Sequence, residues 1–243
     1  VLLDAANSGS TYLWSDLSAA QTLLVSLSGT YSVVVTDANS CTGSDIINVT
    51  INKGEFVSIV GQSGTGKTTM VKLLIGEEKA DAGKIIVGGW DITDIGQREI
   101  PVLRRQIGVV FQDFKLLNKK TLFENVSFAL QVCGESGKKI NSIVPQVLKI
   151  VGLENKMRRY PLQVSGGEQQ RAVIARALVH RPKILLADEP TGNLDSINAD
   201  EIIEILQKIN KFGTTVVLVT HNREVVNKLR KRVVTVENGI VVG

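Results

Sequence analysis

The stretch FVSIVGQSGTGKTT, residues 56–69, decides the fold of this chain. Its apolar start, residues 56–60, is typical of a short buried strand, and the glycine-rich loop after it leads into a run with helical spacing of apolar residues. Residues 61–68, GQSGTGKT, match the pattern G-x-x-x-x-G-K-[ST] at every fixed position. This order of strand, loop and helix predicts a phosphate-binding loop and therefore a P-loop nucleoside triphosphatase.

The residue types of this loop explain how it holds phosphate. Its glycines are expected to take positive φ angles, so that backbone N–H groups close around phosphate oxygens. Lys67 reaches the β- and γ-phosphates in such loops, and the Thr68 hydroxyl is a ligand for Mg²⁺. The helix that begins at Lys67 points the positive end of its dipole at the same anion. We predict that the nucleotide is bound by Gly61, Ser63, Gly64, Thr65, Gly66, Lys67, Thr68 and Thr69.

The chain from residue 51 onward alternates strand-like and helix-like segments, which predicts an α/β fold with a mainly parallel sheet. Buried strands are expected within residues 106–112, 183–190 and 214–221. Helices are expected over residues 67–76, 168–180 and 198–213, and a largely helical stretch over 121–152. Two hairpins are expected, at 84–92 about Gly88-Gly89 and at 232–242 about Asn238-Gly239. A helical subdomain then occupies about residues 113–165.

Two adjacent acids follow one of the predicted strands, in ILLADEP, residues 184–190. The strand delivers Asp188 and Glu189 at its carboxyl end, where open α/β sheets bind their ligands. We expect Asp188 to hold Mg²⁺ and Glu189 to accept a proton from an attacking water. Such a pair is only moderately specific by itself.

A second glycine motif, VSGGEQQR at residues 164–171, starts another helix. Ser165 and Glu168 have the spacing of a capping box. Gly166 and Gly167 leave the first amides of that helix uncovered, which predicts a second anion site.

Together with the phosphate loop and LLADEP, VSGGEQQR is similar to the LSGGQ signature of ABC-type ATPases. The resemblance covers about residues 50–243. It implies that Gln112 in VVFQD belongs to the Q-loop, Asp195 in NLD to the D-loop, and His221 in VTHN to the H-loop. The family would then use ATP and Mg²⁺, with catalysis by Glu189, His221 and Gln112. The implied Mg²⁺ ligands are Thr68, Gln112 and Asp188.

Several segments resemble most the cell-division ATPases of the FtsE type, among them RRQIGVVFQDFKLL and ILLADEPTGNLD. That subfamily implies a homodimer on ATP binding, in which Ser165, Gly166, Gly167 and Glu168 act on the other subunit's ATP. It also implies a cytoplasmic, peripheral place on the inner face of the membrane, beside an FtsX-like integral membrane protein. The docking surface is expected around Phe114, Leu116, Leu117 and Phe123, and ordinary packing within the helical subdomain is the alternative for any one of them. ATPases for lipoprotein release or macrolide export remain the alternative within the family.

Residues 1–50 differ from the rest, since they are rich in Ser and Thr and contain four Asp but no Lys or Arg. Runs such as TYSVVVTD predict short strands and resemble immunoglobulin-like or PKD-like repeats of bacterial adhesins. We therefore expect an incomplete β-rich segment, 1–50, before an ATPase domain, 51–243, and a possible chimera joined near 45–53. The stretch DIINVTINKGEF is expected to supply a strand at that join. A fusion whose extra strands enter the ATPase sheet, a surface-binding β module and a disabled ATPase are the alternatives.

The net charge of +4 arises from a basic excess after residue 50. A DNA-repair or chromosome ATPase would use that charge, but such proteins separate the two glycine motifs by long coiled coils, and the interval from Lys67 to Ser165 has no sustained heptads. We expect no nucleic-acid partner. The apolar runs are too short for a membrane-spanning helix. Cys41 and Cys133 form no metal-binding pair.

Overall fold

The computed structural model describes residues 2–4, 11–14, 18–20, 22–24, 33–36, 42–45, 49–81, 83–237 and 240–242. Its central sheet has six strands in the spatial order β13 (Ile240–Val242), β12 (Arg232–Glu237), β6 (Phe56–Val60), β11 (Thr215–Thr220), β10 (Ile184–Asp188) and β9 (Ile107–Val110). The strands β12, β6, β11, β10 and β9 run parallel, and β13 pairs antiparallel with β12. This confirms the predicted α/β fold with a mainly parallel sheet.

One face of the sheet is covered by α1 (Lys67–Leu74) and α2 (Ile100–Gln106). Side chains alternate along β6, so Val57 and Ile59 point to this face and pack with Val71 of α1 and Leu103 of α2. The hairpin of β7 (Ile86–Val87) and β8 (Trp90–Asp91) lies on the same side, and its turn is Gly88-Gly89 as predicted. The two strands of the other predicted hairpin also form, but Asn238 and Gly239 lie outside the described residues.

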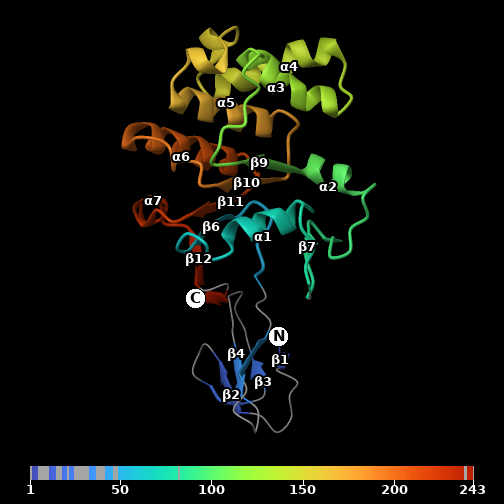
Figure 1. Cartoon of the computed structure of the whole chain (residues 1–243), viewed down its shortest axis with the longest axis vertical. Coiled ribbons are helices and arrows are strands. Elements are labelled where there is room, and N and C mark those ends of the chain that lie inside the picture. The colour runs from blue at the N-terminus through green and yellow to red at the C-terminus, as the bar shows by residue number, and fades with distance from the viewer. Residues whose placement is uncertain are drawn as a thin grey trace.

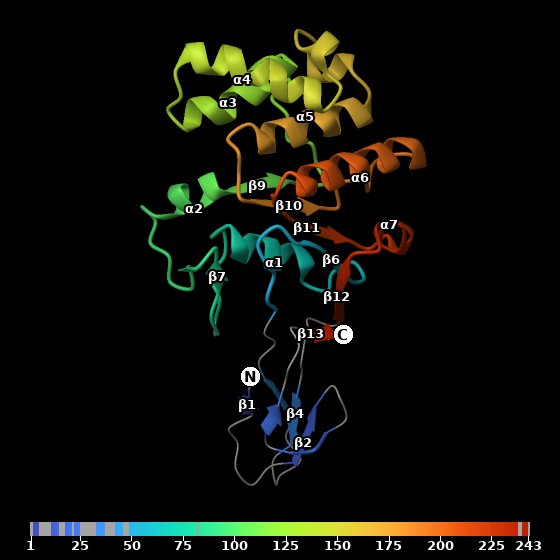
Figure 2. The ribbon, with the colours of Figure 1, turned by 180° about the vertical axis from the view of Figure 1, so that it is seen from behind.

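The opposite face carries α5 (Gly166–Leu178) and α6 (Ser196–Lys211), which pack on apolar residues of the sheet such as Leu185 and Leu218. Beyond α5 lie α3 (Leu122–Val132) and α4 (Gly137–Ile150). Figures 1 and 2 show this layering from two sides, with α3 and α4 outermost, then α5, α6, the sheet and α1. The remaining short helices are η1 (Glu154–Lys156), η2 (Pro161–Gln163) and α7 (Arg223–Leu229).

The predicted helical stretch 121–152 forms two helices, because the chain turns between Val132 and Gly137. Thr121 caps α3 with a complete capping box, and Ser136 caps α4 by accepting a hydrogen bond from the Lys139 amide. The Ser136 cap starts α4 as a separate helix. The second helix can therefore fold back on the first.

The described N-terminal strands are β1 (Leu2–Asp4), β2 (Thr11–Trp14), β3 (Thr22–Leu24), β4 (Val33–Thr36) and β5 (Thr42–Asp45). They pair only with one another, in the sheets β1-β3 and β2-β4-β5, so they do not enter the ATPase sheet. Figure 1 shows β1 to β4 at the end of the molecule opposite α3 and α4. The strand expected at the join is also wrong for residues 49–53, which are not extended in a sheet; residues 46–48 lie outside the described part.

Candidate functional site

The site forms at one edge of the parallel sheet, where four strands end. Register pairs join Val60 of β6 to Thr220 of β11, and Asp188 of β10 to Val219. On the other side of β10, Ala187 lies opposite Val110 of β9. Because these strands run in the same direction, the loops that follow them converge at their carboxyl ends.

The phosphate loop leads from β6 into α1. Gly64 and Gly66 have φ angles of 82° and 92°, as predicted, and glycine takes this conformation without steric cost. Gly66 is the N-cap of α1 and makes no side-chain capping bond, and the first turn contains no acid. The amides at the start of α1 are therefore uncovered by any cap and lie beside the positive end of the helix dipole.

Lys67 is buried and lies over the loop rather than in solvent. Its Nζ donates hydrogen bonds to the carbonyl oxygens of Gly61 at 2.8 Å and Gln62 at 2.6 Å. These contacts hold the ammonium where an anion in the loop would meet it.

Gly61 corrects the sequence-based explanation of this loop. Its φ is not positive, unlike those of Gly64 and Gly66. A Cβ at this position would instead collide with the carbonyl oxygen of Val236 on β12 and come within 2.8 Å of Thr65 Oγ1. Glycine is required here because a neighbouring strand passes too close for a side chain.

Asp188 is buried and is bound on one side only. Its Oδ2 accepts a hydrogen bond from the Thr68 hydroxyl at 3.1 Å, whereas the buried Oδ1 has no partner among the described residues. Burial raises the pKa of Asp188 above its ordinary value, and the charge of Glu189 raises it further, against the lowering effects of Thr68 and Lys67. A buried carboxylate oxygen without a partner, next to a hydroxyl, suits a hard divalent cation, so these residues fit Mg²⁺.

Glu189 is held rigidly by the end of β11. Its Oε1 accepts from the His221 amide at 2.9 Å and lies 2.6 Å from His221 Nδ1, and its Oε2 accepts from the Thr220 hydroxyl at 3.1 Å. An ionised carboxylate only accepts, so Nδ1 of His221 then carries the proton. Glu189 also has a φ of 47°, a conformation that costs energy in a non-glycine residue and is typical of functional sites.

Gln112 completes the group from the β9 side. Its side-chain amide lies beside the loop after Glu189, since a Cβ at Gly192 would lie 3.1 Å from Gln112 Nε2. One cavity of about 340 Å³ gathers most of the predicted residues: Ser63, Gly64, Gly66, Lys67, Thr68, Thr69, Gln112, Asp188, Glu189 and His221. Gly61 and Thr65 line an adjoining cavity of about 480 Å³ that also touches Ser63 and His221.

The predicted signature residues lie elsewhere. Ser165 is the N-cap of α5 and forms the predicted capping box with Glu168, whose carboxylate also accepts from Lys156 Nζ at 2.5 Å. Asp195 is the N-cap of α6, where its carboxylate is bound by Asn198. Neither these caps nor the glycines after Ser165 line the cavity. The chain therefore brings the phosphate loop, the acids, Gln112 and His221 together, but not the signature.

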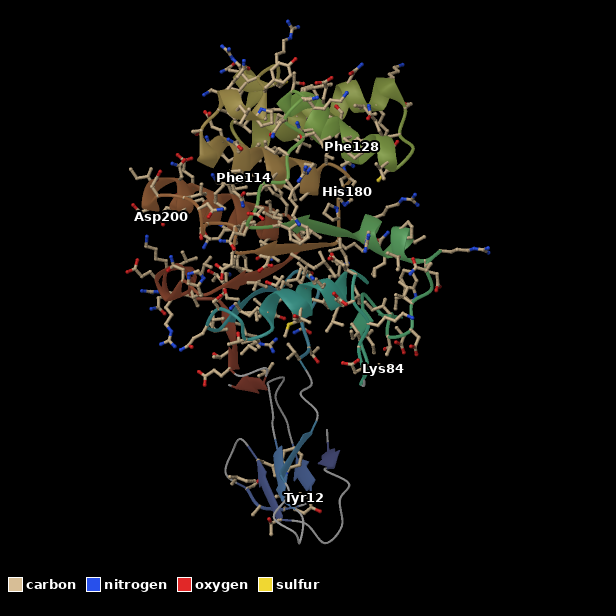
Figure 3. All side chains as sticks on the ribbon, viewed as in Figure 1. Tyr12, Lys84, Phe114, Phe128, His180 and Asp200 are labelled. Carbon is tan, nitrogen blue, oxygen red and sulfur yellow. The ribbon has the colours of Figure 1, made fainter. Side chains whose placement is uncertain are left out.

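The docking surface expected from sequence is partly buried at three of its four residues. Phe114, Leu116 and Phe123 are partly buried and pack against the core, and Figure 3 places Phe114 at the junction between the sheet and the outer helices. Leu117 is the exception, with 43% of its surface exposed. One residue of the site, Thr220, was missed from sequence; its only signal is a hydroxyl at the end of a buried strand, directly before His221.

None of the helices in the described part of the chain is long and apolar enough to cross a membrane. The sequence profile of the ABC transporter family matches residues 44–192. This match begins at residue 44 and gives no support to the likeness of residues 1–50 to adhesin repeats.

Curated relatives match most of the chain. The cell division ATP-binding protein FtsE of Bacillus subtilis (strain 168) is 53% identical over 196 residues, which is 81% of this chain and 86% of the relative. The protein of the same name from Streptococcus pneumoniae (strain D39) is 50% identical over 204 residues, 84% of this chain and 89% of the relative. The FtsE of Mycobacterium tuberculosis (strain H37Rv) is 49% identical over 198 residues, 82% and 86% respectively.

Solved structures of two ABC proteins resemble this chain. The ATP-binding cassette MJ0796, described as a dimer in a post-hydrolysis state bound to ADP and phosphate, superposes with a TM-score of 0.73 at 36% identity, covering 82% of this chain and 87% of that one. The cbiO1 subunit of the cbiONQ transporter from Clostridium perfringens superposes with a TM-score of 0.76 at 29% identity, covering 86% and 84%. The chain therefore belongs to the ABC transporter family, as one of its ATP-binding domains.

Proposed function

We propose that this chain, an ATPase by its family, powers a membrane ABC complex of FtsE type that acts in cell division. The observation that carries the ATPase part is the shared cavity of Lys67, Thr68, Asp188, Glu189 and His221. The cell-division part is supported by the FtsE relatives at 45–53% identity.

The roles of the site residues follow from their positions. The amides of residues 63–69 and the Lys67 ammonium would bind the phosphates of ATP, and Thr68, Asp188 and Gln112 would hold Mg²⁺. Bound Mg²⁺ would neutralise charge on the β- and γ-phosphates. Glu189 takes the proton of the attacking water as general base. His221 keeps the Glu189 carboxylate in place through its backbone amide and Nδ1.

A second copy of the chain supplies the signature. Ser165, Gly166, Gly167 and Glu168 are outside the cavity of their own chain, so we infer that they act on the ATP of a partner subunit in an ATP-dependent homodimer, with Asp195 near the contact. The dimeric form described for MJ0796, whose fold is shared, supports this arrangement. The N-terminus of α5 is the positive end of a helix dipole, which would favour such an anion.

The remaining assignments rest on sequence and family. The ATPase domain spans 51–243, with a helical subdomain of about 113–165, and is peripheral on the inner face of the membrane through an FtsX-like partner. The exposed Leu117 is one contact for that partner. Residues 1–50 form a separate β-rich unit, because their described strands pair only with one another. The proposal that they derive from an adhesin repeat rests on sequence resemblance alone.

Glu189→Gln tests the ATPase and the dimer together. The amide keeps the shape of the side chain but removes the base, so turnover is expected to fall about 10²–10⁴-fold while ATP still binds. Light scattering should give 26.3 kDa without nucleotide and twice that with Mg-ATP. The matched control is Glu204→Gln on α6, whose carboxylate is exposed. Near-normal turnover of Glu189→Gln would remove Glu189 as the base, and a monomer at millimolar ATP would refute the dimer.

The partner is tested by copurification in detergent. The chain is expected to be retained by an FtsX protein and not by a permease for lipoprotein release or macrolide export. The opposite preference would support the alternative within the family.

A further inference from the structure

The segment that carries Gln112 into the cavity is residues 111–115, here called the Gln112 loop. Lys115 ends the loop with a φ of 46°, a left-handed conformation that is unusual for a residue with a side chain. The Lys115 Nζ folds back over the Phe111 ring, 4.1 Å from its centroid. The first and last residues of the loop are therefore in contact through their side chains. Contacts that fix the ends of the loop also fix the position of Gln112 between them.

Arg176, in the last turn of α5, holds one end. Its Nη1 donates to the carbonyl oxygen of Lys115 at 2.7 Å, and its Nη2 donates to that of Phe114 at 3.1 Å. The planar guanidinium thus binds two successive carbonyls through two separate nitrogens, whose relative placement is fixed by the plane of the group. Phe114 and Lys115 lie about sixty positions before Arg176 in the sequence.

The setting of Arg176 is unusual for a cation. Among the ion pairs of the described residues, none involves Arg176; its described partners are the two carbonyls. Burial lowers the pKa of its guanidinium. The half-buried guanidinium is therefore satisfied by backbone carbonyls and not by a carboxylate. Its contribution to the structure is its pair of hydrogen bonds to the Gln112 loop.

The other side of the loop is held from the region after Glu189. Asn193 Nδ2 donates to the carbonyl oxygen of Gln112 at 3.3 Å. At its far end α5 also touches the loop, since a Cβ at Gly166 would lie 3.8 Å from the Phe114 ring. The Gln112 loop therefore lies between α5, which begins at Ser165, and the segment that follows Glu189.

We propose that Arg176 is a positioning residue for hydrolysis, which fixes the Gln112 loop to α5 so that Gln112 and Ser165 keep one relative placement. This rests on the proposed role of Gln112 in the site. Arg176 does not line the cavity, and within the described part of the chain its hydrogen bonds reach Phe114 and Lys115, so its effect on catalysis passes through the loop.

The contact itself is tested without activity, by limited trypsin digestion of the full chain. Trypsin cuts after Lys115, and the carbonyl of that bond is the acceptor of Arg176. Cleavage there in Arg176→Ala, relative to cleavage after the exposed Lys138 in the same molecule, is expected to rise about tenfold or more as the loop opens locally. Arg176→Lys should rise less. The matched control is Arg171→Ala, on the same helix, whose partner is Glu201 on α6.

The positioning role is tested by a double-mutant cycle on ATP turnover. Arg176→Ala is expected to lower kcat about ten- to a hundredfold with KM for ATP changed less than about threefold, as for a misplaced group near the reacting centre. In a Gln112→Ala background the same substitution should change kcat less than about twofold, because the group that it positions is gone. Arg171→Ala should have the same proportional effect in both backgrounds.

The outcomes separate the two proposals. Unchanged cleavage after Lys115 would overturn the contact, whatever the turnover. Equal kcat losses with and without Gln112 would overturn the positioning role and leave Arg176 as a general stabiliser. If the unaltered chain hydrolyses no ATP, the proposed function fails, while the digestion still tests whether Arg176 holds the loop. If Arg176→Ala does not fold, Arg176→Lys carries both tests.

Discussion

The helices α1 and α5 begin with the same kind of sequence, two glycines beside a hydroxyl residue, yet their first turns differ. The start of α1 has Gly66 as its cap, no side-chain capping bond and no acid. The start of α5 has Ser165 as its cap, a complete capping box and Glu168 in the first turn. Both present amides and a positive dipole end, but only α1 leaves them without a bonded side chain.

This difference supports the proposal that the start of α1 binds ATP within the chain. An uncapped start is unfavourable alone and becomes satisfied when a phosphate binds to it. A capped start is already stable, so α5 keeps its shape without ligand, as the proposed action on the nucleotide of another subunit requires. Asp188 and His221 converge on α1, whereas Lys156 neutralises Glu168 at α5.

The largest expected effect is at the uncapped start. Lys67→Ala removes the only ammonium within the loop, so we expect turnover to fall about 10²–10³-fold, as when one donor to a charged transition state is lost. Lys72→Ala is the matched control, because Lys72 lies on α1 but is only partly buried and pairs with Glu77 and Glu78. Steady-state hydrolysis measures both. Equal losses would mean that α1 acts through its overall charge and not through Lys67.

An effect of intermediate size on turnover is expected at the capped start of α5. Ser165→Ala should cost about 1 kcal/mol of the free energy of unfolding, the usual value of an N-cap, and should also slow turnover at least about tenfold. Thr121→Ala removes the same kind of capping box from α3 and should cost the same stability without slowing turnover. Thermal denaturation and hydrolysis are measured on both. If Thr121→Ala slows hydrolysis as much, Ser165 acts as a cap only.

The part of the site that is predictable from sequence is the part whose geometry is local. Gly64, Gly66, Lys67 and Thr68 lie within five positions, so the order of strand, loop and helix largely determines their relative placement. The capping box at Ser165 is equally local, since its two side chains are one helical turn apart. Motif spacing fixes such contacts because the chain has few ways to arrange them.

Contacts that depend on packing between distant segments are harder to foresee. His221 meets Glu189 because β10 and β11 are neighbours in parallel register, which the sequence indicates only through two buried strands. Gly61 was predicted for its φ angle and is needed for clearance from β12. For Phe114 the sequence left docking and ordinary packing open, and the structure packs its partly buried ring against the core. In each case the deciding atom belongs to a segment that sequence spacing does not place.

The smallest expected effect concerns Glu168 itself. Lys156 bonds its carboxylate and holds the pKa of Glu168 below its ordinary value, as does the Ser165 amide, against the raising effect of burial. The stability from this depressed pKa is present at neutral pH and is lost as the pH falls below about 4 through the folded pKa. Glu168→Gln keeps the capping-box geometry but not the ion pair, so it should cost at most about 1 kcal/mol at pH 7, because Lys156 is largely exposed. The difference in melting temperature from the unaltered chain should then shrink as the solution is acidified. A difference that stays constant with pH would mean that Glu168 stabilises α5 by its shape, and that charge does not distinguish the two helix starts.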